Sequence, residues 1–139
     1  GELKTCPTCF ATTPASDCGI CSNPQRLKNI VAVIEKETDL ISLEKTRKFN
    51  GRYLVLGDLK KDGVLNQVQK LRLQTIKNAD EVILAISPTA YGDINSALIA
   101  QELKGAAKKI TRLGRGIPTG GEIEFADEET LGSALDNRN

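Results

Sequence analysis

The sequence predicts an α/β protein in which a parallel β-sheet is flanked by helices and preceded by a small four-cysteine module. From residue 27 onward, short and nearly unbroken apolar runs alternate with helical patterns, as expected of parallel strands buried on both faces. Ahead of them stand two Cys-x2-Cys pairs. The 139 residues suffice for one compact domain plus a small additional module.

The module contains Cys6, Cys9, Cys18 and Cys21, which form two pairs separated by a short polar loop with Pro14. Each pair can present two thiolates to one tetrahedral ion. Two disulfides or a redox-active pair are the alternatives, but the spacing fits a metal better and a redox pair would not need its duplicate. The sequence therefore predicts one Zn²⁺ per chain, held structurally in a closed four-thiolate site. Because few apolar residues lie in residues 1–26, we expect their folding to depend on the metal, and the sheet to stay folded without it.

Four strands are expected in the body of the chain. Each is a short apolar run bounded by polar or glycine-containing segments. The runs cover residues 29–35, 53–56, 81–86 and 109–113. Because the chain between consecutive runs carries helical patterns, the strands are expected to lie parallel.

Helices are expected between these strands. Thr38 can cap the first, which ends near Lys48. The second ends near Lys77, and its helical spacing is carried by Val64, Val68 and Leu71.

Two further helices follow in the second half of the chain. Residues 93–104 suit a helix with Ile94, Ala97 and Leu98 facing inward. The glycine-rich and acidic tail ends in a helix that Asp127 can cap and that runs through Leu131 and Leu135.

Composition narrows the function. A formal net charge of +1 gives no global attraction to nucleic acid, so any such contact must come from local patches or from a partner. The absence of histidine excludes Ser-His and Cys-His catalysis, and five aromatic residues argue against a base-stacking platform. The sequence has no apolar run near the roughly 18 residues of a membrane helix and no signal-peptide pattern. We expect a cytoplasmic protein with no membrane contact.

The sequence resembles the RecR family of bacterial recombination mediators. The resemblance covers nearly the whole chain and rests on the joint order and spacing of several short segments. They are residues 6–24, 31–35, 49–53, 81–85, 87–93, 111–118 and 120–127.

The resemblance implies a domain plan: a zinc finger over residues 1–26, a Toprim domain over 27–115 and a C-terminal segment over 116–139. The family also has an N-terminal helix-hairpin-helix, and this sequence begins about where the zinc finger begins. DNA contact is expected mainly through that hairpin domain. As the resemblance implies it, the family forms homo-oligomers, from dimer to tetramer. It acts with RecO and RecF to help load RecA onto single-stranded DNA.

Enzymes of the Toprim class carry a glutamate at the first strand and an Asp-x-Asp pair at the third, which hold magnesium. Glu35 stands at the first place, but Ser87 and Thr89 occupy the second and cannot supply the anionic charge that magnesium requires. We therefore expect no catalysis. The alternatives are a metal-dependent Toprim nuclease or primase-like enzyme and, more remotely, a zinc module that binds small acidic ligands at the glycine-rich tail.

Functional groups of a parallel sheet collect at the carboxyl ends of its strands. The resemblance associates this edge with partner binding, so Glu35 and Asp93 are expected to receive basic residues of RecO, with Tyr91 as an apolar anchor. In the alternative interpretation Asp93 caps a helix and Glu35 is solvated. Arg112 and Arg115 are candidates for DNA or phosphate contact, or for pairing with acidic residues of the tail.

Overall fold

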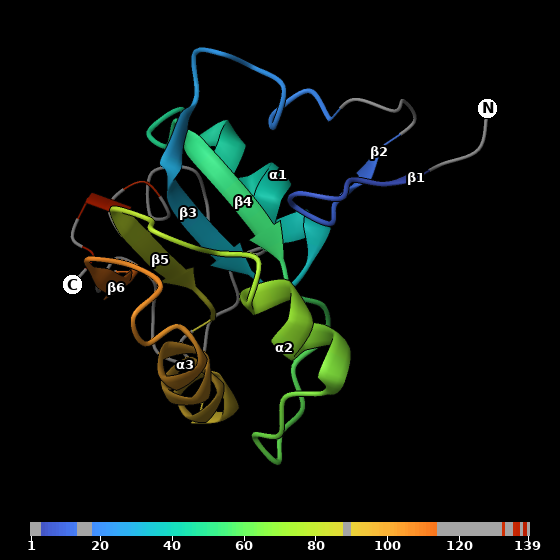
Figure 1. Cartoon of the computed structure of the whole chain (residues 1–139), viewed down its shortest axis with the longest axis vertical. Helices are drawn as coiled ribbons and strands as arrows, with labels where there is room; N and C mark the ends of the chain where they lie inside the picture. Colours follow the sequence, from blue (N-terminus) through green and yellow to red (C-terminus); the bar gives the residue numbers. More distant parts are fainter. Residues whose placement is uncertain are drawn as a thin grey trace.

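A computed structural model describes residues 4–13, 18–87, 90–113, 132, 135, 136 and 138. Figure 1 shows a sheet of strands that run in one direction, with helices packed on both faces. This arrangement confirms the predicted fold class. Within the described part of the chain, no helix combines the length and the apolar character needed to cross a bilayer.

The sheet contains β3 (Leu27–Ile34), β4 (Gly51–Val55), β5 (Glu81–Ala85) and β6 (Ile110–Arg112). Its strand order is β4-β3-β5-β6, and every neighbouring pair is parallel. The first strand of this sheet along the chain, β3, is therefore an inner strand. The next strand, β4, lies on one side of it, and β5 lies on the other. Ligand sites in such sheets lie outside the carboxyl ends, where the strand order reverses.

The helices are α1 (Glu37–Lys45), α2 (Gln67–Leu73) and α3 (Ala90–Glu102). The prediction that Thr38 caps the first helix is wrong, because α1 begins one residue earlier and Asp39 accepts a hydrogen bond from the Lys36 N–H at 3.1 Å. Asn66 caps α2, since its side chain accepts from the Gln69 N–H at 2.8 Å. This cap starts α2 after Val64.

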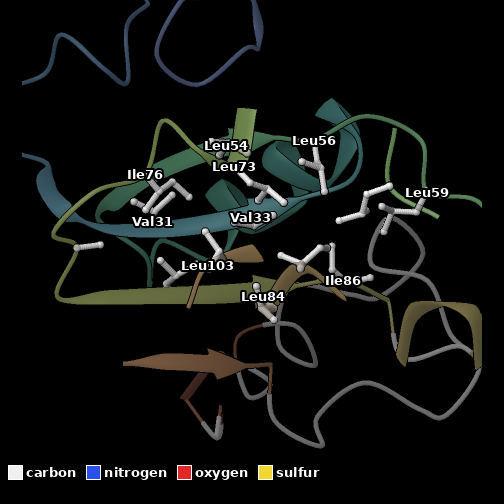
Figure 2. Close-up of a cluster of buried hydrophobic side chains, with 14 residues drawn as sticks. Val31, Val33, Leu54, Leu56, Leu59, Leu73, Ile76, Leu84, Ile86 and Leu103 are labelled. Atoms are coloured by element: carbon white, nitrogen blue, oxygen red, sulfur yellow. The ribbon is translucent and has the colours of Figure 1, made fainter. Parts of the chain in front are cut away.

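Two clusters of buried side chains fill the two faces of the sheet. The α2 and α3 side holds aliphatic residues of β3, β4 and β5 together with Leu73, Ile76, Ile99 and Leu103 (Figure 2). The α1 side holds the alternate residues of the same strands, such as Ile34 and Val55. Alternation along each strand thus divides one apolar run between two cores.

The inward face of α3 differs from the predicted one. Ile94 is 51% exposed and Ala97 is exposed, whereas Asn95 and Ser96 are buried. The Asn95 side-chain amide donates to the Lys60 carbonyl at 2.9 Å, which satisfies a polar group inside the fold. The second helix is also shorter than expected, and Val64, Val68 and Leu71 are exposed.

The cysteine module packs on the α1 side of the sheet. Its short hairpin pairs β1 (Lys4–Thr5) with β2 (Thr12–Thr13), and Thr12 donates to the Glu37 carboxylate through both its N–H and its hydroxyl. The Val55 N–H donates to the Cys9 carbonyl at 2.7 Å, so the module pairs with the outer side of β4. It therefore shares a core with the sheet and is tied to its backbone.

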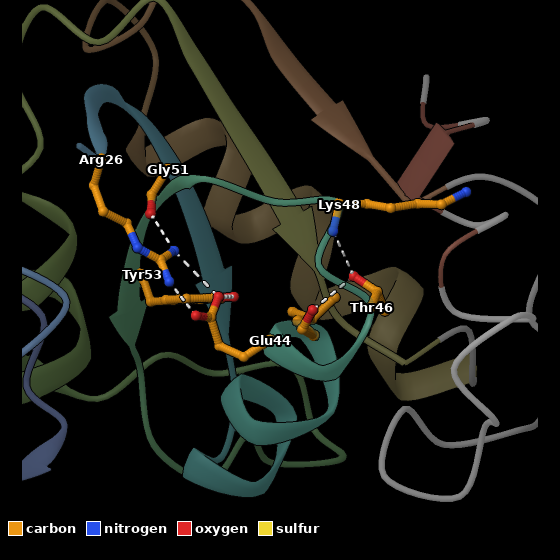
Figure 3. A network of polar contacts seen from close by, with 7 residues as sticks. Arg26, Glu44, Thr46, Lys48, Gly51 and Tyr53 are labelled. Carbon is orange, nitrogen blue, oxygen red and sulfur yellow. Dashed lines mark hydrogen bonds and ion pairs between the residues drawn. The ribbon is translucent and has the colours of Figure 1, made fainter.

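A polar network joins the end of the module to the sheet (Figure 3). Arg26 forms an ion pair with Glu44 of α1 and donates to the Gly51 carbonyl at 2.9 Å. The hydroxyl of the buried Tyr53 donates to the same Glu44 carboxylate. One acidic side chain thus connects the segment after the last cysteine, α1 and β4.

Three described residues near the C-terminus contact this body. Leu135 is buried in the α1-side core, and Asp136 pairs with Lys48. Arg138 donates to the Glu81 carboxylate, which also accepts from the Thr111 hydroxyl at 2.7 Å. The predicted cap at Asp127 and the start of its helix lie outside the described residues.

Candidate functional site

The four cysteine sulfurs converge on one point. Cys6 Sγ lies 3.8 Å from Cys21 Sγ, Cys9 Sγ lies 3.7 Å from Cys18 Sγ, and all four atoms are within 4.8 Å of one another. A tetrahedral ion with metal–sulfur bonds of about 2.3 Å requires sulfurs about 3.8 Å apart, whereas a disulfide needs about 2.05 Å. The four thiols are free, so the geometry fits a metal ion and argues against disulfides.

Burial sets the charge state of this cluster. It raises the pKa of the Cys9 thiol, and it raises that of Cys21 to about 12. Burial acts in the same direction on Cys6, but N–H groups of Cys9 and Thr8 donate to its sulfur and lower its pKa to about 7. Without a cation, the four groups therefore cannot all be thiolates at neutral pH. A divalent ion would supply the missing positive charge, and the donor set is one that binds zinc.

The cluster has a buried half and a more open half. Cys6 and Cys9 belong to the core on the α1 side, while Cys18 and Cys21 are half-buried. The second turn is held by the Ser22 N–H, which donates to the Cys18 carbonyl at 2.9 Å. Lys28 donates to the Cys21 carbonyl at 2.5 Å. All four sequence-predicted ligands therefore meet, two anchored by the core and two by local hydrogen bonds.

Glu35 follows the inner strand β3 at the carboxyl edge of the sheet. The residue is only 7% exposed, and its Oε2 accepts a hydrogen bond from the Leu59 N–H at 2.8 Å. The Gly57 N–H donates to its carbonyl at 3.0 Å. Glu35 thus holds the segment after β4 against the carboxyl edge, a contact that the sequence did not reveal.

Asp93 lies in the first turn of α3, where a negative charge favours the helix dipole. Its side chain is 62% exposed and accepts a hydrogen bond from the Arg112 guanidinium at 2.7 Å. The predicted acidic contact and one predicted phosphate contact therefore form a pair at the surface. This pair bridges the start of α3 and the end of β6.

The remaining predicted residues are placed less fully. Ser87 follows β5 and is nearly buried, and Tyr91 lies in the first turn of α3, with its side chain outside the described part. Thr89 and Arg115 lie outside the described residues. Among the described residues, the four cysteines are the single group of three or more metal-ligating side chains close enough to share an ion.

Sequence reasoning missed Asp39, which is buried beside the carboxyl edge. Burial raises the pKa of its carboxyl to about 6, and the nearby charge of Glu35 acts in the same direction. In the sequence, Asp39 stands three residues after Lys36. This is the spacing between the N-cap and the N3 residue of a capping box, in which the N3 side chain accepts the backbone N–H of the N-cap residue. Two carboxyl groups therefore lie below the surface at the end of β3.

The sequence of the chain is similar to those of known protein families and of individual proteins. Residues 29–114 match the family described as Toprim domain, and residues 116–139 match the family described as RecR, C-terminal. A protein named Recombination protein RecR from Clostridium perfringens is 38% identical over 148 aligned positions, covering 99% of this chain and 72% of the relative. A protein of the same name from a Synechococcus strain is 41% identical over 144 positions, covering 99% and 74%.

The fold and these matches define a Toprim-domain protein with a four-cysteine module that can hold a metal ion. The similarity extends along almost the whole chain and includes both family matches. The chain belongs to the RecR family.

Proposed function

We propose that this chain is a recombination and repair mediator, which acts with RecO and RecF to help load RecA onto single-stranded DNA. The observation that carries the proposal is similarity to proteins named Recombination protein RecR over 99% of the chain. The mediator works by binding and positioning other macromolecules in the bacterial cytoplasm, and it catalyses no reaction of its own.

The chemistry of the carboxyl edge supports a role without catalysis. The place of the Asp-x-Asp pair of Toprim enzymes is taken here by Ser87 and Thr89, whose hydroxyls carry no charge. Glu35 is largely buried and already accepts a backbone hydrogen bond from Leu59. A magnesium ion prefers several anionic or carbonyl oxygens that face an open site. Glu35 and Asp93 provide at most two such carboxylates.

The same edge supports binding of a basic partner. Asp93 is exposed, and its pair with Arg112 is weak because exposed ion pairs contribute roughly 0–1 kcal/mol. A basic side chain of RecO can therefore displace Arg112 or join it. In this proposal Tyr91 supplies the apolar anchor, and Glu35 holds the neighbouring loop from beneath while its charge adds to the acidic field.

The cysteine cluster is proposed to hold one Zn²⁺ in a structural role. All four donors are protein sulfurs, which leaves no coordination position for a substrate. The division into a zinc finger (1–26), a Toprim domain (27–115) and a C-terminal segment (116–139) stays a prediction. The proposed assembly is a homo-oligomer, in which DNA contact through a helix-hairpin-helix domain is a feature of the family.

Calorimetric titration of the chain with the RecO of the same organism tests the proposal. A saturable complex that weakens when Asp93 is replaced by lysine would support it. Absence of binding, or binding that neither Asp93→Lys nor Glu35→Ala changes, would contradict it. The alternative, a Toprim nuclease or primase-like enzyme, predicts Mg²⁺- or Mn²⁺-dependent cleavage or nucleotidyl transfer that disappears in Glu35→Gln.

A further inference from the structure

We propose that the amino edge of the sheet, opposite its carboxyl edge, binds the sugar–phosphate backbone of single-stranded nucleic acid. The proposal rests on the proposed function for its choice of ligand, and on the distribution of charge for its location. The surface is called the amino-edge row and consists of six basic residues. They are Lys28, Arg52, Lys77, Lys104, Lys108 and Lys109.

The net charge of +1 conceals this concentration. The amino-edge row lies on the segments that enter the four strands, and its lysines are exposed. Lys28 also donates to the Cys21 carbonyl, and Arg52 donates to the Lys28 carbonyl at 3.0 Å. The exposed acids on these segments are Asp80 and Glu102. A third acid, Glu81, is buried and engaged by Arg138 and Thr111. Positive charge therefore exceeds negative charge along this edge.

The topology sets these charges side by side. Parallel strands place all their amino ends along one edge, as Figure 1 shows. Neighbouring strands lie about 4.8 Å apart, so the four entry points span about 14 Å. Arg52 lies near the start of β4, Lys28 at the start of β3, and Lys108 and Lys109 directly before β6. A linear polyanion with regularly spaced charges fits a row of this kind.

The part of the row nearest β6 is rigid. The Ala79 N–H donates to the Ala106 carbonyl at 3.0 Å, and the Lys108 N–H donates to the Ala79 carbonyl at 2.9 Å. The Val82 N–H donates to the Lys109 carbonyl at 2.9 Å. The backbone that carries Lys108 and Lys109 is thus fixed to the segment before β5. Lysines on a fixed backbone lose less entropy when they bind an ordered ligand.

A recess of about 550 Å³ opens beside the row, between the ends of α2 and α3. Lys77 and Lys104 line it together with the acid Glu102 and with Gln74 and Asn78. The two amides can hydrogen-bond a sugar or a phosphate oxygen. The volume falls within the range of pockets that hold small ligands. The recess therefore offers room for one nucleotide unit while the lysines contact the phosphates on either side.

The ion pair of Lys108 with Asp80 leaves the row available. Lys108 and Asp80 approach to 3.4 Å, but their side chains are 82% and 50% exposed. Such a pair contributes little and is easily exchanged for a phosphate. Asp80 keeps a second partner, because the Asn29 side chain donates to it at 2.9 Å.

The small number of aromatic residues is consistent with contacts to phosphates and not to bases. The chain has five aromatic residues in all, so stacking on bases contributes little. The amino-edge row would contact the phosphates and bind without preference for a base sequence. At the carboxyl edge, the exposed carboxylate of Asp93 repels phosphate. Nucleic acid and a basic protein partner would thus occupy opposite edges of one sheet.

The alternative account is that these lysines are solvated and complement the C-terminal ends of α2 and α3. Fluorescence anisotropy distinguishes this account from the proposed binding of nucleic acid. A labelled oligothymidylate of about 20 nucleotides is titrated with the full chain at about 20 to 200 mM salt. The test variant is Lys104→Glu with Lys109→Glu. The matched control is Lys60→Glu with Lys61→Glu, which changes the net charge equally on exposed residues of the segment after β4.

We expect the unmodified chain to bind with an affinity that falls as salt rises, by a slope of about −0.7 per phosphate contacted. The test variant should bind roughly tenfold more weakly and lose about 1.4 from that slope, while the control stays within about twofold. Equal losses in both variants, or no binding at the lowest salt, would overturn the proposal. Titration of the same variants with RecO reports the carboxyl edge separately, so failure of one proposal does not conceal the other.

Discussion

Asp93 and Arg112 form a surface ion pair, with the guanidinium donating to the carboxylate at 2.7 Å. The two residues come from α3 and β6, and their pairing means that neither acts independently at the carboxyl edge. A partner that binds Asp93 must share it with Arg112, and a phosphate that binds Arg112 must compete with Asp93. The pair therefore provides a way to separate the two proposed roles.

Replacing Asp93 by alanine should weaken the complex with RecO roughly tenfold, because a negative charge is lost from the proposed contact. The free energy of unfolding should change by less than about 1 kcal/mol, since the pair is exposed. Calorimetry and urea unfolding measure the two effects. Arg112→Ala is the matched control, because it breaks the same pair but keeps the carboxylate. If both variants weaken RecO binding alike, the pair and not the carboxylate is what matters.

Metal removal should loosen the cysteine module and also lower the stability of the sheet. Cys6 and Cys9 share the α1-side core, and the Cys9 carbonyl accepts the Val55 N–H, so the effect reaches β4. We expect a thermal midpoint about 10 °C lower, for a loss of about 3 kcal/mol. Hydrogen exchange should speed up first in residues 4–13 and 18–26, while β3 and β5 stay protected.

Addition of Zn²⁺ to the chelated protein is the control for this experiment, and it should restore both the midpoint and the slow exchange. A single cooperative loss of all structure on chelation would show instead that the module and the sheet cannot fold separately. That result would contradict the prediction that the sheet survives without the metal.

Glu44→Ala should cost about 2–4 kcal/mol in the free energy of unfolding. The change leaves the Arg26 guanidinium, whose side chain is 14% exposed, and the hydroxyl of the buried Tyr53 without their shared acceptor. Burial and the neighbouring Glu44 raise the pKa of Tyr53, so this hydroxyl stays protonated and donates. Urea unfolding measures the loss, and Glu102→Ala on exposed helix surface should stay within about 0.5 kcal/mol.

Asp39 should make stability depend on pH below neutrality. Burial raises the pKa of its carboxyl from 3.8 to about 6, so between these values the folded state binds more protons than the unfolded state. The contribution of Asp39 therefore favours folding least above pH 6 and improves as the pH falls toward 4. Asp39→Asn, which can still accept the Lys36 N–H, should be more stable than the unmodified chain at pH 8.

This advantage should amount to one or a few kcal/mol at pH 8 and shrink at pH 5. The difference between the two proteins in urea midpoint is the quantity to follow, because loss of metal at low pH affects both. An advantage that stays constant across this range would rule out titration of Asp39 as its source.

The sequence predicted the four-cysteine cluster more completely than any other feature. Two Cys-x2-Cys pairs limit the chain to few conformations that bring four sulfurs together, so spacing alone was sufficient. The strands were predicted within a few residues because β3 and β5 are buried on both faces and read as unbroken apolar runs. The two-residue strands β1 and β2 are too short to show a period.

The inward face of α3 could not be found from hydrophobicity. Asn95 and Ser96 face the interior, where the Lys60 carbonyl accepts from Asn95, while Ile94 lies against Gly63 and remains half exposed. A side chain at Gly63 would meet the Ile94 Cγ2 at 2.5 Å, so glycine permits this close approach. Likewise Glu35 read as a surface acid, because its acceptor role depends on the distant Leu59 N–H. Such tertiary hydrogen bonds leave no local pattern.

The most direct test of the proposed function is the rate at which RecA assembles on single-stranded DNA coated with its binding protein, measured with RecO present and with or without this chain. The proposed function predicts faster assembly when the chain is added, an effect reduced by Asp93→Lys. It also predicts intact DNA at the end of the reaction. No acceleration despite a RecO complex, or Mg²⁺-dependent cleavage of the strand, would contradict it.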